Sequence, residues 1–182
     1  MSKADSARLH EQTARAEIIH RVGLRDNALV LYLGAIGALV SVAGSGTSGK
    51  EILLIIPYLA FGATTIIEHH HTMIGVLSYY LAVELDSNYR KIREFVPHWD
   101  SSPRIREVLN KRPYLIQRKF AHWILVAVPA IVSLVVNYEY IGKESVLTAA
   151  WWLGLMLTLL SIIVTAQSSA YRKALRVSKL SE

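Results

Sequence analysis

The 182-residue sequence predicts an all-α, polytopic membrane protein with four transmembrane helices. Its composition is 52% hydrophobic with a mean hydropathy of +0.31, which is apolar for a soluble domain of this length. A hydrocarbon core of ~30 Å needs roughly 20 helical residues to cross it. Four apolar stretches reach that length, at residues 27–45, 52–85, 120–138 and 146–166.

The distribution of basic residues predicts the orientation of these helices. Of the 20 lysines and arginines, only Lys50 and Lys143 lie in the two short connections that follow the first and third stretches. The rest lie at 1–26, 86–119 and 167–182. Because lysine and arginine are retained on the cytoplasmic side, this asymmetry places both termini and the central segment inside.

Residues 1–26 form a predicted amphipathic helix on the cytoplasmic side. A loose apolar stripe runs among charged residues, and Gly23 is the one residue of this segment that weakens a helix. We therefore expect the helix to continue almost unbroken into the first span. Two interpretations remain open: a docking or oligomerisation surface, or a segment lying on the lipid headgroups.

A hairpin of two spans is predicted for residues 27–85. In its first helix Gly34, Gly37 and Ser41 share one face, and small residues let membrane helices approach closely. The pattern predicts packing and homo-oligomerisation, although the partner helix can belong to this chain or to another copy. The second stretch would be ~51 Å long as one helix, so it projects into the cytoplasm, with a kink expected at Pro57.

Residues 86–119 are expected to form a basic cytoplasmic connector. The segment 97–103 reads as a turn, and a serine–proline pair at its end predicts a short helix over 103–110. Four arginines are candidates for docking a cytoplasmic protein or binding headgroups: Arg90, Arg93, Arg104 and Arg106.

A second hairpin is predicted for residues 120–166, and a basic cytoplasmic tail for 167–182. Pro129 lies inside the third span and predicts a kink. Trp151 and Trp152 stand near the start of the fourth span, where we expect both to belong to the aromatic belt at the membrane interface.

The candidate site for chemistry is a polar run in the second span, Glu-His-His-His at 68–71. Glu68 and His71 are three residues apart on one helix face, and His122 is expected at a similar depth in the third span. One carboxylate and two imidazoles can hold a metal ion or relay protons. The competing interpretation is a polar collar at the interface that binds nothing, because consecutive histidines point in different directions.

No enzyme activity, cofactor or nucleic-acid partner is expected. The sequence has no cysteine and no nucleophile elbow. If the second span starts at Ile52 it leaves the membrane at about His71, so Glu68 is the one carboxylate within the spans. The loop 44–50 has the spacing of a phosphate-binding loop, but Glu51 stands where that motif needs serine or threonine. Retention of basic residues inside the cell already accounts for the net charge of +6.

Residues ~10–102 resemble small bacterial multi-span membrane proteins. The likeness lies in AEIIHRVGLRDNALVLYLGAIGALVSV, in HHTMIGVLSYYLAVEL and in PHWDSS. The nearest class is the membrane components of anti-phage defence systems, namely SLATT-type pore effectors and four-span partners in two-gene systems. SLATT-type proteins usually have two spans, where this sequence has four.

The resemblance implies an inner-membrane sensor or anchor for a cytoplasmic protein, or a pore-forming effector, and it carries no catalytic residues. The alternative expected from the residues themselves is a small channel or transporter with a His/Glu site at the inner face.

Overall fold

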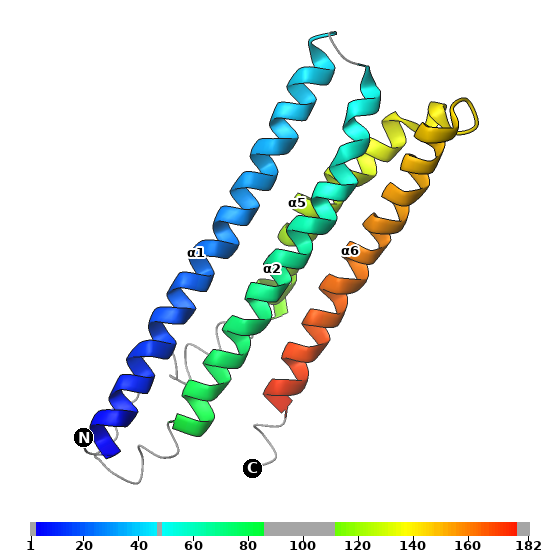
Figure 1. The fold of residues 1–182 in the computed structure, drawn as a ribbon. Helices are drawn as coiled ribbons and strands as arrows, with labels where there is room; N and C mark the ends of the chain where they lie inside the picture. The colour runs from blue at the N-terminus through cyan, green and yellow to red at the C-terminus, as the bar shows by residue number, and fades with distance from the viewer. Residues whose placement is uncertain (1–2, 47–48, 86–111, 178–182) are drawn as a thin grey trace.

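The computed structural model describes residues 3–46, 49–85 and 112–177, and every element in these ranges is helical. Four long helices run side by side: α1 (Lys3–Gly44), α2 (Ile56–Tyr79), α5 (Arg112–Val136) and α6 (Ser145–Val177) (Figure 1). The start of α1 and the end of α6 lie at one end of the bundle, here called the terminal end. The end of α1, the start of η1 (Lys50–Ile55) and the segment 137–144 lie at the other, here called the hairpin end.

Three of these helices are long and apolar enough to cross a membrane. They cover Asp5–Gly44, Lys50–Tyr79 and Ser145–Gln167. In α5 the apolar run among the described side chains is shorter, Ile124–Val136. The all-α class is thereby confirmed for the described residues, and the three apolar helices indicate a membrane protein. The passage of several helices through the membrane, the fourth span and the orientation remain predictions.

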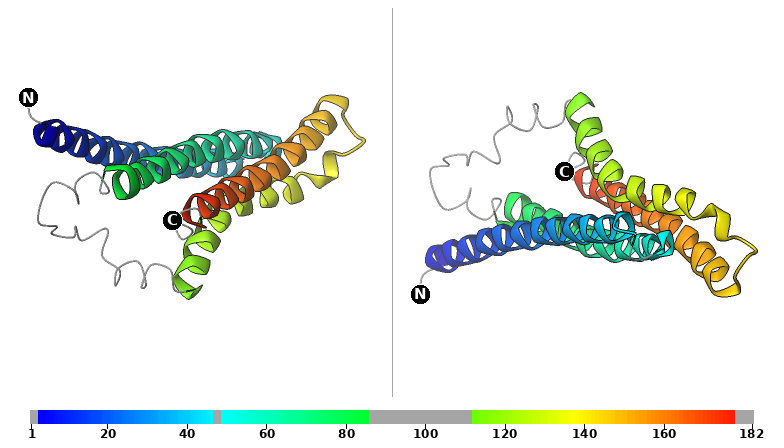
Figure 2. Two further views of the ribbon diagram at one scale, coloured as in Figure 1. Left: turned by 90° about the horizontal axis from the view of Figure 1, so that it is seen from below. Right: turned by 90° about the horizontal axis from the view of Figure 1, so that it is seen from above.

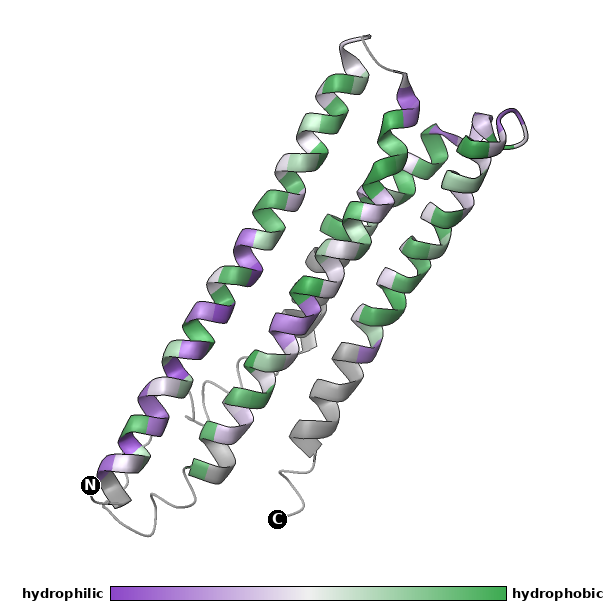
Figure 3. Cartoon of the chain, viewed as in Figure 1, coloured by the Kyte–Doolittle hydropathy of each residue, from purple (hydrophilic) through white to green (hydrophobic). Residues whose placement is uncertain are grey.

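Helix α1 is a single helix of 42 residues, about 63 Å long at 1.5 Å per residue. No proline interrupts it, so the amphipathic segment and the apolar segment share one axis. Polar residues dominate its terminal half and apolar residues its hairpin half (Figure 3). Two i,i+4 ion pairs lie in the polar half, Arg15–Glu11 at 3.0 Å and Arg21–Glu17 at 2.7 Å.

The second stretch is not one kinked α-helix. It begins with a 3₁₀ segment, η1 (Lys50–Ile55), continues as α2 and ends in a π-helical segment, η2 (Tyr80–Leu85). Pro57 stands in the first turn of α2, so it opens the helix instead of kinking it. The physical reason is that a proline in the first turn interrupts no hydrogen bond of its own helix.

Because Pro57 has no N–H, the carbonyl of Leu53 must find other donors. The Ile56 N–H donates to it within the 3₁₀ turn, and the Ser133 hydroxyl of α5 donates to it across the bundle. Pro57 at the start of α2 is thus linked through the Leu53 carbonyl to Ser133 of α5, which lies 76 positions after Pro57 in the sequence.

Helix α2 is the centre of the bundle, because it packs against α1, α5 and α6 (Figure 2). Its buried Ala60, Ala63 and Ile67 meet Tyr32 of α1 and two buried residues of α5, Val126 and Ala130. The hydroxyl of Tyr32 donates to the Val126 carbonyl at 3.0 Å. Small residues on α2 therefore permit the close approach that holds helices together in lipid.

At the hairpin end, aromatic side chains tie α6 to its neighbours. Trp151 is 9% exposed and donates through Nε1 to the Leu134 carbonyl at 2.8 Å, while Trp152 is 56% exposed. Tyr58 donates to the Ala150 carbonyl at 3.2 Å. Only Trp152 therefore fits the predicted aromatic belt. Trp151 turns inward because α5 ends at Val136 and leaves the Leu134 carbonyl without a helical donor.

Pro129 lies inside α5, as its place in the sequence predicts. A short 3₁₀ segment, η4 (Tyr138–Tyr140), follows, and the chain then turns at Gly142 with φ of 80°. The Gly142 N–H donates to the hydroxyl of Thr148, which itself donates to the Tyr140 carbonyl. The turn is thus closed by the side chain of Thr148, which lies in the first turn of α6.

Candidate functional site

The four residues of the polar run 68–71 point in different directions from α2. Glu68 is 4% exposed and lies inside the bundle, His69 is exposed, and His70 and His71 are half-buried. Glu68 and His71 both have interaction partners in the protein. A carboxylate within a membrane-spanning helix is costly, and such groups usually face a protein interior or a watery cavity.

The structure leaves the metal hypothesis as a prediction. Among the residues whose side chains are described, no group of three His, Asp or Glu residues is arranged to hold a metal ion. The backbone of His122 belongs to α5, but its side chain lies outside the described residues. Whether Glu68, His71 and His122 meet is therefore not shown.

Polar residues of α2 and α6 stand at matching levels. The backbone of Gly154 approaches Pro57 so closely that a Cβ there would lie 3.3 Å from the proline ring. Both helices run from the hairpin end to the terminal end (Figure 1), so this contact sets the register. It brings Thr64 level with Ser161, and both are buried. Glu68 follows one turn further along α2, so the buried carboxylate belongs to a polar seam.

The hydroxyls of α6 mostly bond to their own helix. Thr158 donates to the Gly154 carbonyl, Ser161 to that of Leu157 and Thr165 to that of Ser161. This is the common behaviour of serine and threonine in membrane helices. On α2, by contrast, the buried hydroxyl of Thr64 has no hydrogen-bond partner among the described residues.

The small-residue stripe of α1 faces away from the bundle. Gly34, Gly37 and Ser41 are exposed, and no atom lies within 4 Å of the position that a Cβ would take on either glycine. Within the described part of the chain, the stripe therefore has no partner helix. Oligomerisation through it remains a prediction.

The predicted docking arginines cannot be placed. Arg90, Arg93, Arg104 and Arg106, together with the short helix expected over 103–110, lie outside the described residues. The tail beyond Val177 lies outside them as well.

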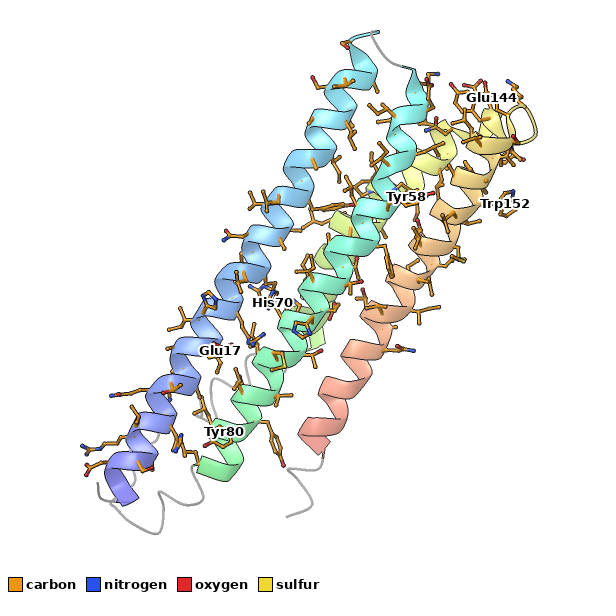
Figure 4. All side chains as sticks on the ribbon, viewed as in Figure 1. Glu17, Tyr58, His70, Tyr80, Glu144 and Trp152 are labelled. Carbon is orange, nitrogen blue, oxygen red and sulfur yellow. The ribbon has the colours of Figure 1, made fainter. Side chains whose placement is uncertain are left out.

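One cluster was not anticipated from the sequence. His70 lies in the space between α2 and α1 (Figure 4), within the electrostatic reach of His69, Arg21 and His20. The periodicity of either helix alone does not predict this. Counting residues outward from Gly44 and from Lys50 would have placed the two segments near one level, because the antiparallel helices of a hairpin bring together residues at similar distances from their connection.

An apolar crevice of about 390 Å³ lies between α5 and α6 near the hairpin end. Its lining is mostly apolar and includes Leu134, Trp151 and Leu155. This composition suits contact with hydrocarbon.

Comparison of the chain with models of known protein families, with curated protein sequences and with solved structures gave no match.

Proposed function

We propose that the chain is a homo-oligomeric, four-span component of a bacterial inner membrane, with both termini in the cytoplasm, that serves an anti-phage defence system. It acts as a sensor or anchor for a cytoplasmic protein, or as a pore-forming effector. The observation that supports this most is α1. At about 63 Å it is twice the thickness of the ~30 Å hydrocarbon core, and its surplus length is its charged terminal half.

A helix of this form supports a platform at the cytoplasmic face. The terminal half of α1 continues the axis of the span, which favours a stalk over a segment lying flat on the headgroups. In the proposed topology the basic segments 86–119 and 167–182 lie on the same side of the membrane as this half of α1. A protein partner inside the cell would account for such a surface.

Topology is tested first, with reporter fusions at Thr47 and Gly142. The proposal requires both sites to report the outside of the inner membrane. A cytoplasmic result at either site would remove the four-span, N-in and C-in arrangement.

The defence role is tested by phage challenge of cells with and without the chain. The membrane potential is then measured during infection, and soluble proteins that co-purify with the chain are identified. We expect protection that is lost when residues 3–20 of α1 are deleted. Protection with an intact potential and a co-purified soluble protein supports the sensor, whereas a collapse of the potential on infection supports the pore. If the chain gave no protection and co-purified with no soluble protein, the proposal would be contradicted.

A second candidate is a small channel or transporter with its site at the inner face, and the buried carboxylate of Glu68 favours it. Its test is proton flux into liposomes that contain the purified chain. Glu68→Gln should abolish the flux, and Glu51→Gln, at an exposed position of the hairpin end, should not. Equal flux in all three proteins would exclude a role for Glu68.

A further inference from the structure

The inference rests on the proposed arrangement in which α1 and α2 both cross the membrane. His70 follows Lys50 by 20 residues, which is about 30 Å of helix, and Arg21 precedes Gly44 by 23 residues, which is about 35 Å. Both distances match the thickness of the hydrocarbon core counted from the hairpin end. In that arrangement the cluster between α1 and α2 lies where the opposite layer of lipid phosphates begins.

Two helices contribute nitrogen donors to this cluster. His20 and Arg21 come from α1, and His69 and His70 come from α2. The two neighbouring imidazoles pack edge to face with ring centroids 5.7 Å apart. The acidic neighbour is Glu17, whose carboxylate pairs with Nη2 of Arg21 at 2.7 Å.

Two nitrogen atoms of the cluster are buried without a hydrogen-bond partner among the described residues. They are Nδ1 of His70 and Nε of Arg21. A buried polar atom that lacks a partner costs free energy, and an acceptor bound between the helices would remove that cost. An acceptor that meets a guanidinium and an imidazole at this depth is most simply a phosphate oxygen.

We infer that Arg21 and His70, with His20 beside them, bind the phosphate group of an anionic phospholipid between α1 and α2 at the terminal end of the bundle. The phosphate accepts hydrogen bonds from Nε of Arg21 and from the His70 imidazole. The acyl chains of the lipid lie along the apolar side of α1. Free inorganic phosphate carries the same chemistry without the acyl chains.

The experiment is native mass spectrometry of the full-length protein in detergent at one fixed pH. The probes are phosphatidylglycerol, phosphatidylcholine and inorganic phosphate. We expect phosphatidylglycerol to bind more tightly than phosphatidylcholine, and Arg21→Gln and His70→Leu each to lower its affinity about tenfold or more. If inorganic phosphate displaced phosphatidylglycerol and bound with equal affinity, the acyl chains would contribute nothing and a lipid site would be contradicted.

The control is Arg15→Gln, because Arg15 pairs with Glu11 at the same i,i+4 spacing on the same helix. A basic residue near an anionic surface contributes only about fivefold without any site, so the control should lose no more than that. Equal losses for Arg15→Gln and Arg21→Gln would overturn the inference.

A gain of binding provides a test that does not depend on loss of fold. Glu17→Gln frees the Arg21 guanidinium from its carboxylate and should tighten phosphatidylglycerol binding, whereas Glu11→Gln should not. Unchanged affinity in Glu17→Gln would show that the guanidinium does not meet the lipid.

Discussion

Helices α1 and α2 have similarly apolar spans but very different surroundings. Within the most apolar window of each, 6% of α1 is buried inside the bundle, compared with 44% of α2. In water α1 would expose a hydrophobic surface, whereas in lipid the hydrocarbon would cover it. Apolarity therefore shows that both helices are suited to cross a membrane and does not show which one builds the core.

What distinguishes the two helices is the direction in which their small residues face. On α2, Ala60 and Ala63 lie in the buried core, and Pro57 meets Gly154 of α6. On α1, Gly34 and Gly37 lie on the outer surface. Small residues thus permit close packing on α2 and leave an open face on α1.

The largest expected effect comes from filling the space beside a glycine. In Gly154→Leu, the new side chain must displace Leu134 and Pro57, and overpacking of this kind costs about 1–3 kcal/mol. Gly37→Leu, on the open face of α1, should leave the thermal stability of the single chain unchanged. Equal losses in both variants, measured by thermal unfolding in detergent, would break the comparison.

A smaller effect is expected where α5 supports the start of α2. Ser133→Ala removes a donor to the Leu53 carbonyl and should lower the free energy of unfolding by about 1 kcal/mol. Pro57→Ala supplies a backbone N–H to that same carbonyl, so the loss should shrink in the double variant. Additive losses in a double-mutant cycle would show that the two residues act independently.

The tie between α1 and α5 through Tyr32 is expected to be weaker. Hydrogen bonds between membrane helices average about 0.6 kcal/mol, so Tyr32→Phe should reduce stability by that order. Tyr58→Phe is the matched change on α2. A loss for Tyr32→Phe well above that for Tyr58→Phe would mean that α1 is held more firmly than its burial indicates.

The smallest effect concerns the hairpin end. The hydroxyl of Tyr140 donates to Oε2 of Glu51 at 3.1 Å, and this hydrogen bond raises the pKa of Tyr140 above its usual value. The stabilisation is therefore present below about pH 10, the ordinary tyrosine pKa, and is lost as the pH rises through the raised value. The melting temperatures of wild type and Tyr140→Phe should converge at high pH. A constant difference would contradict the assignment.

Much of the fold follows from local features of the sequence. The spans are set by apolar length, and the continuity of α1 follows from the absence of proline in it. The direction of Trp151 could not be predicted, because it depends on where α5 ends and on which carbonyl is left without a donor. The role of Pro57 likewise depends on Ser133, which is close only in the folded chain.

The candidate site was predictable in part. Ionisable residues within a predicted span cost free energy, so the sequence alone marks Glu68 and the three histidines after it as a candidate site. The structure places the Glu68 carboxylate inside the bundle. The proximity of His70 to Arg21 and His20 depends on the register between α1 and α2, which neither helix carries in its own periodicity. The outward direction of the stripe at Gly34 and Gly37 needs the same information.

The central claim is that the open face of α1 meets a second copy of the chain while α2 stays inside one copy. The sequence contains no cysteine, so single cysteines can be introduced without background. Gly37→Cys tests the stripe, and Leu153→Cys, exposed on α6 at a similar distance from the hairpin end, is the control. On oxidation of native membranes, the account predicts a disulfide-linked dimer for Gly37→Cys and none for Leu153→Cys. No dimer at Gly37→Cys, or equal dimer at both positions, would contradict it.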